Sequence, residues 1–107
     1  MAKKLLFLCS QNKLRSPTAE SVFSEYKNVE VDSAGLNDGA EIPLTQEHLE
    51  WCDHIFVMEK NHRNRLNRKF GKHLKGKRVT VLNIPDDYDY MDEALIVLLK
   101  QRCSMYF

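Results

Sequence analysis

Four short strand-like runs alternate along this chain with segments patterned as helices, and this alternation constrains the fold more than any other feature. The strand-like runs are residues 4–8, 29–32, 54–58 and 78–82. The helical segments are residues 17–26, 45–51, 61–70 and a last helix that begins at Asp89 or Asp92. Strands joined through helices form right-handed crossovers, which place the strands parallel in one sheet. The sequence therefore predicts an α/β fold, a small doubly wound sheet of four parallel strands flanked by helices.

The length of the chain and its cysteine content limit the classes of protein to which it can belong. The 107 residues correspond to one domain, which we expect to span residues 1–107. Three cysteines, far apart in the sequence, predict neither a disulfide framework nor a zinc site, and the four histidines are not spaced as paired ligands. We therefore assign no metal and no other cofactor. The first apolar run is too short for an export signal or a membrane span, which predicts a cytoplasmic protein.

The turn between the first predicted strand and the first predicted helix carries the strongest functional signal. It reads Cys9-Ser10-Gln11-Asn12-Lys13-Leu14-Arg15-Ser16-Pro17. In a doubly wound fold, ligands bind beyond the C-terminal ends of the strands. A loop of this length can wrap its backbone N–H groups around a tetrahedral oxyanion, and the following helix adds its positive end. The residues predicted to bind phosphate are Ser10, Gln11, Asn12, Lys13, Leu14, Arg15 and Ser16.

Two side chains of this turn suit phosphoryl transfer. Arg15 can bind two phosphate oxygens at once, and the same positive field favours the thiolate of Cys9, which is the nucleophilic form. Ser16 can donate a hydrogen bond to that sulfur, and as the residue before Pro17 it is also expected to cap the helix. The alternative for Cys9 is an inert thiol at the end of a buried strand.

At these residues the sequence resembles the low-molecular-weight protein tyrosine phosphatase family. The family's loop has a Cys, five residues, Arg-Ser-Pro, a small residue and Glu. The residues that fit this pattern are Cys9, Arg15, Ser16, Pro17, Ala19 and Glu20. Asn12 matches the asparagine that props the family's loop open, residues 31–35 resemble its second signature, and residues 54–58 resemble a strand that ends in Met. The resemblance spans most of the chain.

The resemblance implies a phosphotyrosine phosphatase I-like fold and a metal-independent phosphomonoester hydrolase with a cysteinyl-phosphate intermediate. Its substrate would be a phosphorylated protein, most simply at tyrosine, or another phosphomonoester, and its product inorganic phosphate. The chain departs from the family at Gln11, where a Gly is usual, and at Leu14, where a second Cys often stands. It also has a short segment between Gly35 and Pro43, so it resembles a trimmed variant.

An acid must protonate the leaving oxygen, and the loop after the fourth predicted strand supplies the candidates. This loop reads Ile84-Pro85-Asp86-Asp87-Tyr88-Asp89-Tyr90 and should reach the same sheet edge as Cys9. The family's general acid lies in an Asp-Pro-Tyr turn, which Asp86-Asp87-Tyr88 resembles. We therefore expect Asp86 to be the general acid, with Asp87 as the second candidate. Asp89 and Asp92 are equally suited to cap the last helix.

Two other functions are compatible with the sequence. Arsenate reduction uses a similar oxyanion loop but needs further cysteines in relay, and no nearby Cys pair exists in the sequence. A non-catalytic anion-binding module is the second alternative, because residues 60–78 carry nine Lys or Arg and no Asp or Glu, whereas the whole chain has a net charge of only +1. Such a run could dock an acidic protein. Nucleic acid is an unlikely partner, because Phe70 is the single aromatic residue in the run and is expected in the core.

Overall fold

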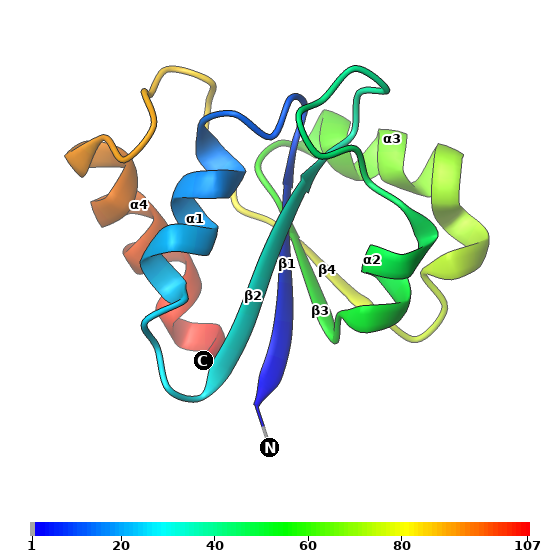
Figure 1. The fold of residues 1–107 in the computed structure, drawn as a ribbon, viewed down its shortest axis with the longest axis horizontal. Coiled ribbons are helices and arrows are strands. Elements are labelled where there is room, and N and C mark those ends of the chain that lie inside the picture. Colours follow the sequence, from blue (N-terminus) through cyan, green and yellow to red (C-terminus); the bar gives the residue numbers. More distant parts are fainter. Residues whose placement is uncertain (1) are drawn as a thin grey trace.

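The computed structural model describes residues 2–107, which form one four-stranded sheet with helices on both faces (Figure 1). The strands are β1 (Lys3–Cys9), β2 (Val29–Gly35), β3 (His54–Val57) and β4 (Arg78–Val81). The helices are α1 (Arg15–Phe23), α2 (Gln46–Trp51), α3 (Lys60–Phe70) and α4 (Glu93–Cys103), with 3-10 turns η1 (Gly71–His73) and η2 (Ser104–Tyr106). All strand pairs are parallel, in the order β2-β1-β3-β4. The predicted α/β fold is confirmed.

The order of the strands places the turn after β1 at the centre of the sheet edge. β1 lies between β2 and β3, so the connection from β1 runs to one side of the sheet and the chain later crosses to the other. Helices α1 and α4 cover one face and α2 and α3 cover the other (Figure 1). The C-terminal end of β1 is therefore the point where the direction of winding reverses, which is where such folds bind ligands.

The two faces of β1 contribute to two separate cores. Alternate side chains of a strand point to opposite faces, so Leu5, Phe7 and Cys9 join the core under α1 and α4. Leu6 and Leu8 join the core under α2 and α3. All five are buried, as the continuous apolar run predicts for a central parallel strand. In residues 2–107, no helix combines the length and apolar character needed to cross a membrane.

The element boundaries differ from the sequence prediction in two places. Helix α1 begins at Arg15 and ends at Phe23, so Ser16 lies inside its first turn and does not cap it, and Tyr26 lies in an exposed turn beyond it. Strand β2 runs on through the Ser33-Ala34-Gly35 stretch that sequence patterns assign to a turn. The reason is tertiary, because all seven residues of β1 pair with β2 and keep its last three residues extended and buried.

Candidate active site

The turn from Cys9 to Arg15 is anchored by the segment that follows β2. The backbone N–H of Leu36 donates to the carbonyl of Cys9 at 2.9 Å, and that of Asn37 donates to Ser10 at 2.9 Å. Gly35 makes this approach possible, because a Cβ there would lie 2.8 Å from the Ser10 carbonyl oxygen and 2.4 Å from the Cβ of Ala40. The short segment after Gly35 therefore forms a fixed support for the loop.

Asn12 ties the middle of the loop to helix α1 and strand β2. Its φ of 56° is left-handed, a conformation that Asn tolerates better than most residues. Its buried side-chain amide donates to Ser16 Oγ and to Ser33 Oγ, both at 3.0 Å, and Ser33 in turn donates to the carboxylate of Glu20. Gln11 is not left-handed and its side chain is exposed, so the residue that replaces the usual Gly fits the loop without strain.

Cys9 lies at the floor of the loop with Ser16 beside it. The distance from Cys9 Sγ to Ser16 Oγ is 2.9 Å. Because the Asn12 amide already donates to Ser16 Oγ, the hydroxyl hydrogen of Ser16 is free to point at the sulfur. A donor in this position stabilises a thiolate over a thiol. The hydrogen bond from Ser16 to the sulfur, expected from the sequence, is thus present in the geometry.

Arg15 is held by one corner of its guanidinium. The side chain is 4% exposed, and its Nη1 donates to Glu59 Oε2 at 2.6 Å and to the carbonyl oxygen of Ile84 at 2.7 Å. Fixing Nη1 orients the planar group, whose Nε faces the carboxylate of Asp86. The edge of a guanidinium formed by Nε and Nη2 can bind two oxygens of one phosphate.

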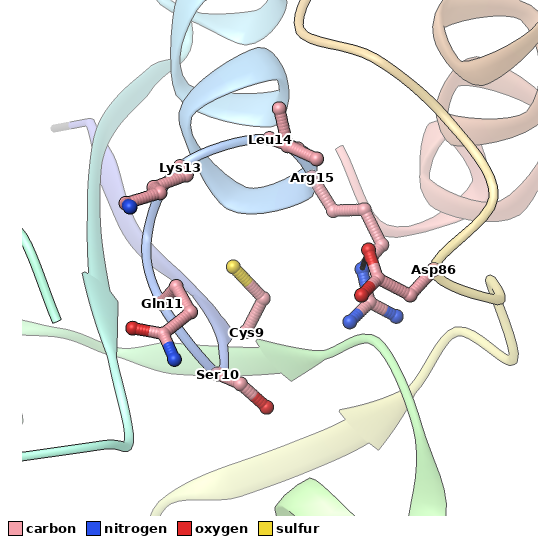
Figure 2. Close-up of a pocket in the computed structure, with 7 residues that line it drawn as sticks. All are labelled: Cys9, Ser10, Gln11, Lys13, Leu14, Arg15 and Asp86. Carbon is pink, nitrogen blue, oxygen red and sulfur yellow. Dashed lines mark ion pairs between the residues drawn. The ribbon is translucent and has the colours of Figure 1, made fainter.

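A cavity of about 100 Å³ opens above these groups, and Figure 2 shows its walls. The lining residues are Cys9, Ser10, Gln11, Lys13, Leu14, Arg15 and Asp86. Asp86 Oδ1 lies 3.7 Å from Arg15 Nε, and the carboxylate is 66% exposed. Asp86 is the member of the acidic pair Asp86 and Asp87 that lines the cavity. The structure thus brings the three residues predicted to be catalytic to one cavity.

Two residues predicted to bind phosphate lie behind the cavity. The side chains of Asn12 and Ser16 contact each other, Ser33 and Cys9, and neither residue lines the cavity. Their side chains therefore support the loop, and a phosphate contact through their backbone N–H groups remains a prediction. In residues 2–107, no three His, Cys, Asp or Glu side chains are grouped as metal ligands.

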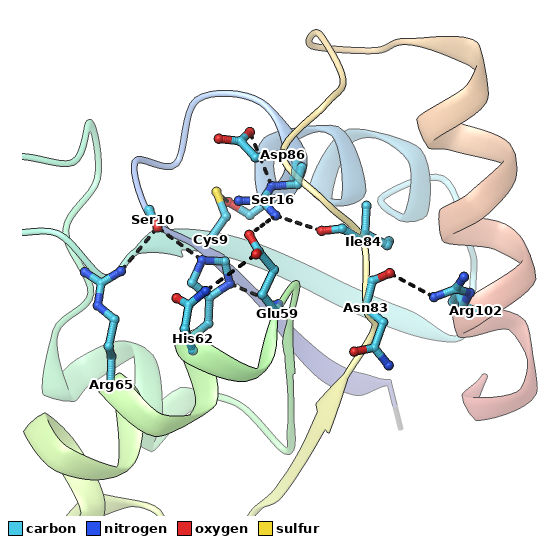
Figure 3. A network of polar contacts seen from close by, with 12 residues as sticks. Cys9, Ser10, Ser16, Glu59, His62, Arg65, Asn83, Ile84, Asp86 and Arg102 are labelled. Carbon is cyan, nitrogen blue, oxygen red and sulfur yellow. Dashed lines mark hydrogen bonds and ion pairs between the residues drawn. The ribbon is translucent and has the colours of Figure 1, made fainter.

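The first turn of α3 supports both ends of the loop, which sequence analysis did not predict (Figure 3). Glu59 holds Arg15, and His62 Nε2 lies 3.1 Å from Ser10 Oγ. His62 Nδ1 accepts from the backbone N–H of Glu59 at 3.1 Å, so the ring hydrogen is on Nε2 and is donated to Ser10. Burial, followed by the Arg15 charge, lowers the pKa of His62 to about 4, which keeps this tautomer neutral. The sequence held one signal for Glu59, which directly follows the third predicted strand, residues 54–58. That strand pairs with β1, so its end lies at the same sheet edge as the loop.

Comparison with known proteins is informative at the level of structure. No family model matches the sequence, and no curated protein matches it. Among solved structures, the chain is similar to the low molecular weight protein tyrosine phosphatase SP-PTP from Streptococcus pyogenes. The TM-score is 0.80 and the identity 16%, over 98% of this chain and 93% of that one. The chain has the low-molecular-weight protein tyrosine phosphatase fold.

Two further structures share this fold with the chain. The tyrosine phosphatase Wzb from Escherichia coli K30, in complex with phosphate, has a TM-score of 0.79 at 20% identity, over 99% of this chain and 96% of that one. The YwlE arginine phosphatase from Geobacillus stearothermophilus has a TM-score of 0.74 at 20% identity, over 96% and 92%. The low-molecular-weight phosphatase fold expected from the loop motif is thus confirmed across nearly the whole chain.

Proposed function

We propose that the protein is a metal-independent phosphomonoester hydrolase, most simply a protein tyrosine phosphatase, that acts through a cysteinyl-phosphate intermediate. One observation carries the proposal. The Cys9 sulfur, with the Ser16 hydroxyl beside it, and the Arg15 guanidinium, oriented through Nη1, line one cavity at the end of the central strand. A nucleophile and a bidentate anion clamp are the two groups that phosphoryl transfer to sulfur requires.

In the first step the Cys9 thiolate attacks phosphorus and the bond from phosphorus to the leaving oxygen breaks. Arg15 and the loop N–H groups bind the oxygens of the transferring group as charge builds on them. Asp86 gives its proton to the leaving oxygen, so that the product departs as an alcohol or phenol. Its exposed position at the cavity rim lets the carboxyl group meet a substrate that enters from solvent.

In the second step water releases the phosphoryl group. Asp86, now a carboxylate, takes a proton from the attacking water, and the bond from phosphorus to sulfur breaks. Inorganic phosphate leaves and the Cys9 thiolate is regenerated, with Ser16 again donating to the sulfur. Each group thus returns to its starting state, and no further reactant is needed.

The support for a phosphotyrosine substrate is the fold, which the chain shares with tyrosine phosphatases. The same fold also occurs in an arginine phosphatase, whose substrate carries phosphorus on nitrogen. The aromatic residues of the acid-bearing loop do not wall the cavity, since Tyr88 packs against the core and Tyr90 lies over α1. A panel of peptides phosphorylated on tyrosine, serine or arginine therefore tests the substrate class directly.

Hydrolysis of para-nitrophenyl phosphate by the purified protein tests the reaction itself. We expect turnover that an added chelator leaves unchanged, and we expect Cys9→Ser to remove it, because an unactivated hydroxyl is a much weaker nucleophile than a thiolate. Cys52→Ala is the matched control, since that thiol lies in the core under α2 and α3. Substantial hydrolysis by a folded Cys9→Ser protein, or loss of activity on chelation, would refute the proposed mechanism.

The arsenate reductase alternative gains no support from the structure. A relay needs thiols that can reach Cys9, but Cys52 lies in the core on the other face of the sheet, and Cys103 ends α4 at the opposite end of the sheet from the Cys9 loop (Figure 1). Burial also raises the pKa of both thiols, that of Cys103 to about 12, which opposes thiolate formation. The three cysteines are unpaired, which fits the reducing conditions of the cytoplasm, where we place the protein.

A further inference from the structure

The basic segment, residues 60–78, begins with helix α3, whose His62 and Arg65 contact Ser10 at the wall of the cavity. The helix buries His62 and Leu66 and exposes most of its charged side chains. The segment contains nine Lys or Arg and no Asp or Glu. A solvated helix with many cations is common and needs no partner. The position of one of these cations, Arg65, distinguishes this helix from that ordinary case.

Arg65 is half-buried at the edge of the phosphate loop (Figure 3). Its Nη1 donates to Ser10 Oγ at 3.2 Å and its Nη2 donates to the side-chain oxygen of Asn37. Both acceptors are neutral, so neither cancels the charge of the guanidinium. Ser10 lines the phosphate cavity, which places the Arg65 charge directly beside it.

A second hollow lies further along the same face of α3. It has a volume of about 150 Å³ and is lined by Arg65, Arg68 and Lys69. Residues three and four apart lie together on a helix, so three cations converge on this hollow. Lys69 Nζ pairs with Asp38 at 2.7 Å, but the Asp38 side chain is 94% exposed, and an exposed pair of this kind is weak enough for an incoming carboxylate to replace. An anion in the hollow would relieve the repulsion among these charges.

The opposite flank of the cavity has the reverse charge. The acidic loop, residues 86–93, carries five Asp or Glu and no Lys or Arg. It connects β4 to α4 and lies across the phosphate loop from α3 (Figure 1). The mouth of the cavity is therefore electrostatically polarised, with cations on one side and carboxylates on the other.

We propose that the hollow on α3 binds an acidic segment of polypeptide on one side of the phosphorylated residue. The inference rests on the proposed function, since the phosphorylated residue would occupy the Cys9 cavity. Carboxylates on the correct side would meet Arg65, Arg68 and Lys69, whereas those on the other side would meet the acidic loop. Complementary charge of this kind favours one direction of binding and penalises the other.

Charge distribution favours a peptide over a nucleic acid. A nucleic acid strand carries phosphates evenly in both directions, so one that crossed the cavity would place some against the acidic loop. The hollow is lined by three cations and no aromatic ring, and Phe70 is packed against the core under α2 and α3. Single-stranded nucleic acids depend on stacking surfaces that this face does not offer.

The experiment compares three phosphotyrosine peptides of equal length, with acidic residues only before, only after, or on neither side of the phosphotyrosine. We expect one acidic peptide to have a kcat/KM roughly tenfold above the neutral peptide, as a few exposed charge pairs would give. The other acidic peptide should be no better than the neutral one. The advantage should shrink on raising the salt concentration, because the charges involved are exposed.

The double variant Arg68→Gln/Lys69→Gln should remove the preference for the favoured acidic peptide while Arg65 keeps its contact with the loop. Lys27→Gln/Lys100→Gln is the matched control, because it removes two exposed positive charges that lie outside the basic segment and should leave the preference intact. Equal kcat/KM for all three wild-type peptides would overturn the inference, and so would a preference that survives the double variant.

Binding to the Cys9→Ser protein separates the two proposals. If no peptide is hydrolysed by the wild-type protein, the proposed function fails. Fluorescence anisotropy would still support docking of an acidic segment if the Cys9→Ser protein bound one acidic phosphopeptide more tightly than the other two peptides. A labelled oligonucleotide is the competing ligand in the same assay. Tighter binding of the oligonucleotide, lost in the Arg68→Gln/Lys69→Gln protein, would overturn the inference in favour of a nucleic acid partner.

Discussion

At the scale of single residues, the geometry discriminates between two neighbouring carboxylates. Asp86 lines the cavity and lies 3.7 Å from Arg15 Nε, whereas Asp87 is exposed and is not part of the lining. The loop resembles the family's Asp-Pro-Tyr turn with Asp87 in place of the proline, and Asp86 lines the cavity all the same. Proximity to the guanidinium also means that Asp86 and a bound phosphate would contact the same side chain.

This difference predicts unequal effects of two substitutions. Asp86→Asn should lower turnover of a poor leaving group, such as a phosphotyrosine peptide, by roughly two to four orders of magnitude, the usual contribution of a general acid. The loss with para-nitrophenyl phosphate should be smaller, because nitrophenolate departs with less need of a proton. Asp87→Asn should change either rate only modestly. Kinetics with both substrates check this, and the opposite pattern in the two variants would move the acid to Asp87.

The orientation of the Arg15 guanidinium is fixed by its neighbours. Its Nη1 is fixed by Glu59 and by the Ile84 carbonyl oxygen, so the orientation of the remaining edge is set before any ligand arrives. An arginine held in this way loses little conformational freedom on binding phosphate. The sequence motif identifies this arginine but gives no information about the two acceptors, which come from other strand ends.

At the scale of elements, the loop from Cys9 to Arg15 packs so closely against the end of β2 that a small side chain is required there. Gly35 faces the Ser10 carbonyl oxygen and the Ala40 Cβ at distances that exclude a methyl group. Gly39, four residues later, has no neighbouring atom within 4 Å of the place where a Cβ would lie. The two glycines thus differ in what they contact, although both belong to the same short connection.

Gly35→Ala should therefore destabilise the fold, whereas Gly39→Ala should not. Forcing a methyl group into a filled space costs about 1–3 kcal/mol of unfolding free energy, because the loop or the segment at Ala40 must shift. Urea unfolding of the two variants and the wild-type protein measures this difference. Similar midpoints for Gly35→Ala and Gly39→Ala would show that the loop moves aside at no cost.

At the scale of the whole molecule, two buried histidines make stability depend on pH. His54 and His62 are each 1% exposed, and they lie at opposite ends of β3 and its connection to α3. Burial is the main cause that lowers the pKa of each from 6.5 to about 4, helped by Lys3 and Arg78 at His54 and by Arg15 at His62. In the folded protein both rings therefore stay neutral at pH values where the unfolded chain would be protonated.

Stability should accordingly fall as the pH is lowered from about 6.5 towards 4. In this window the unfolded chain binds more protons, so each histidine removes about 1.4 kcal/mol per pH unit. Above pH 6.5 neither state binds the proton, so this loss of stability is absent. Urea unfolding at pH 7.5 and pH 5 checks this, with His54→Gln as a variant that lies away from the cavity and should lose less stability on acidification. An unfolding free energy that is equal at the two pH values would contradict it.

The sequence by itself determined the fold class and the position of the candidate site. Alternating strand and helix patterns predicted the parallel sheet, and the residues from Cys9 to Arg15 with the following Ser-Pro placed an oxyanion loop after β1, because these signals are local in the chain. It also placed Asp86 at the correct sheet edge, since all parallel strands end there.

Only the tertiary structure decided how the loop is held. Glu59, His62 and Arg65 reach the loop from α3 because β3 pairs with β1, a contact between residues about 50 positions apart. The extension of β2 to Gly35 has the same origin, because it depends on pairing with β1. Local patterns do not record which distant groups will meet, because that depends on strand order and register, which the packing of the two cores selects.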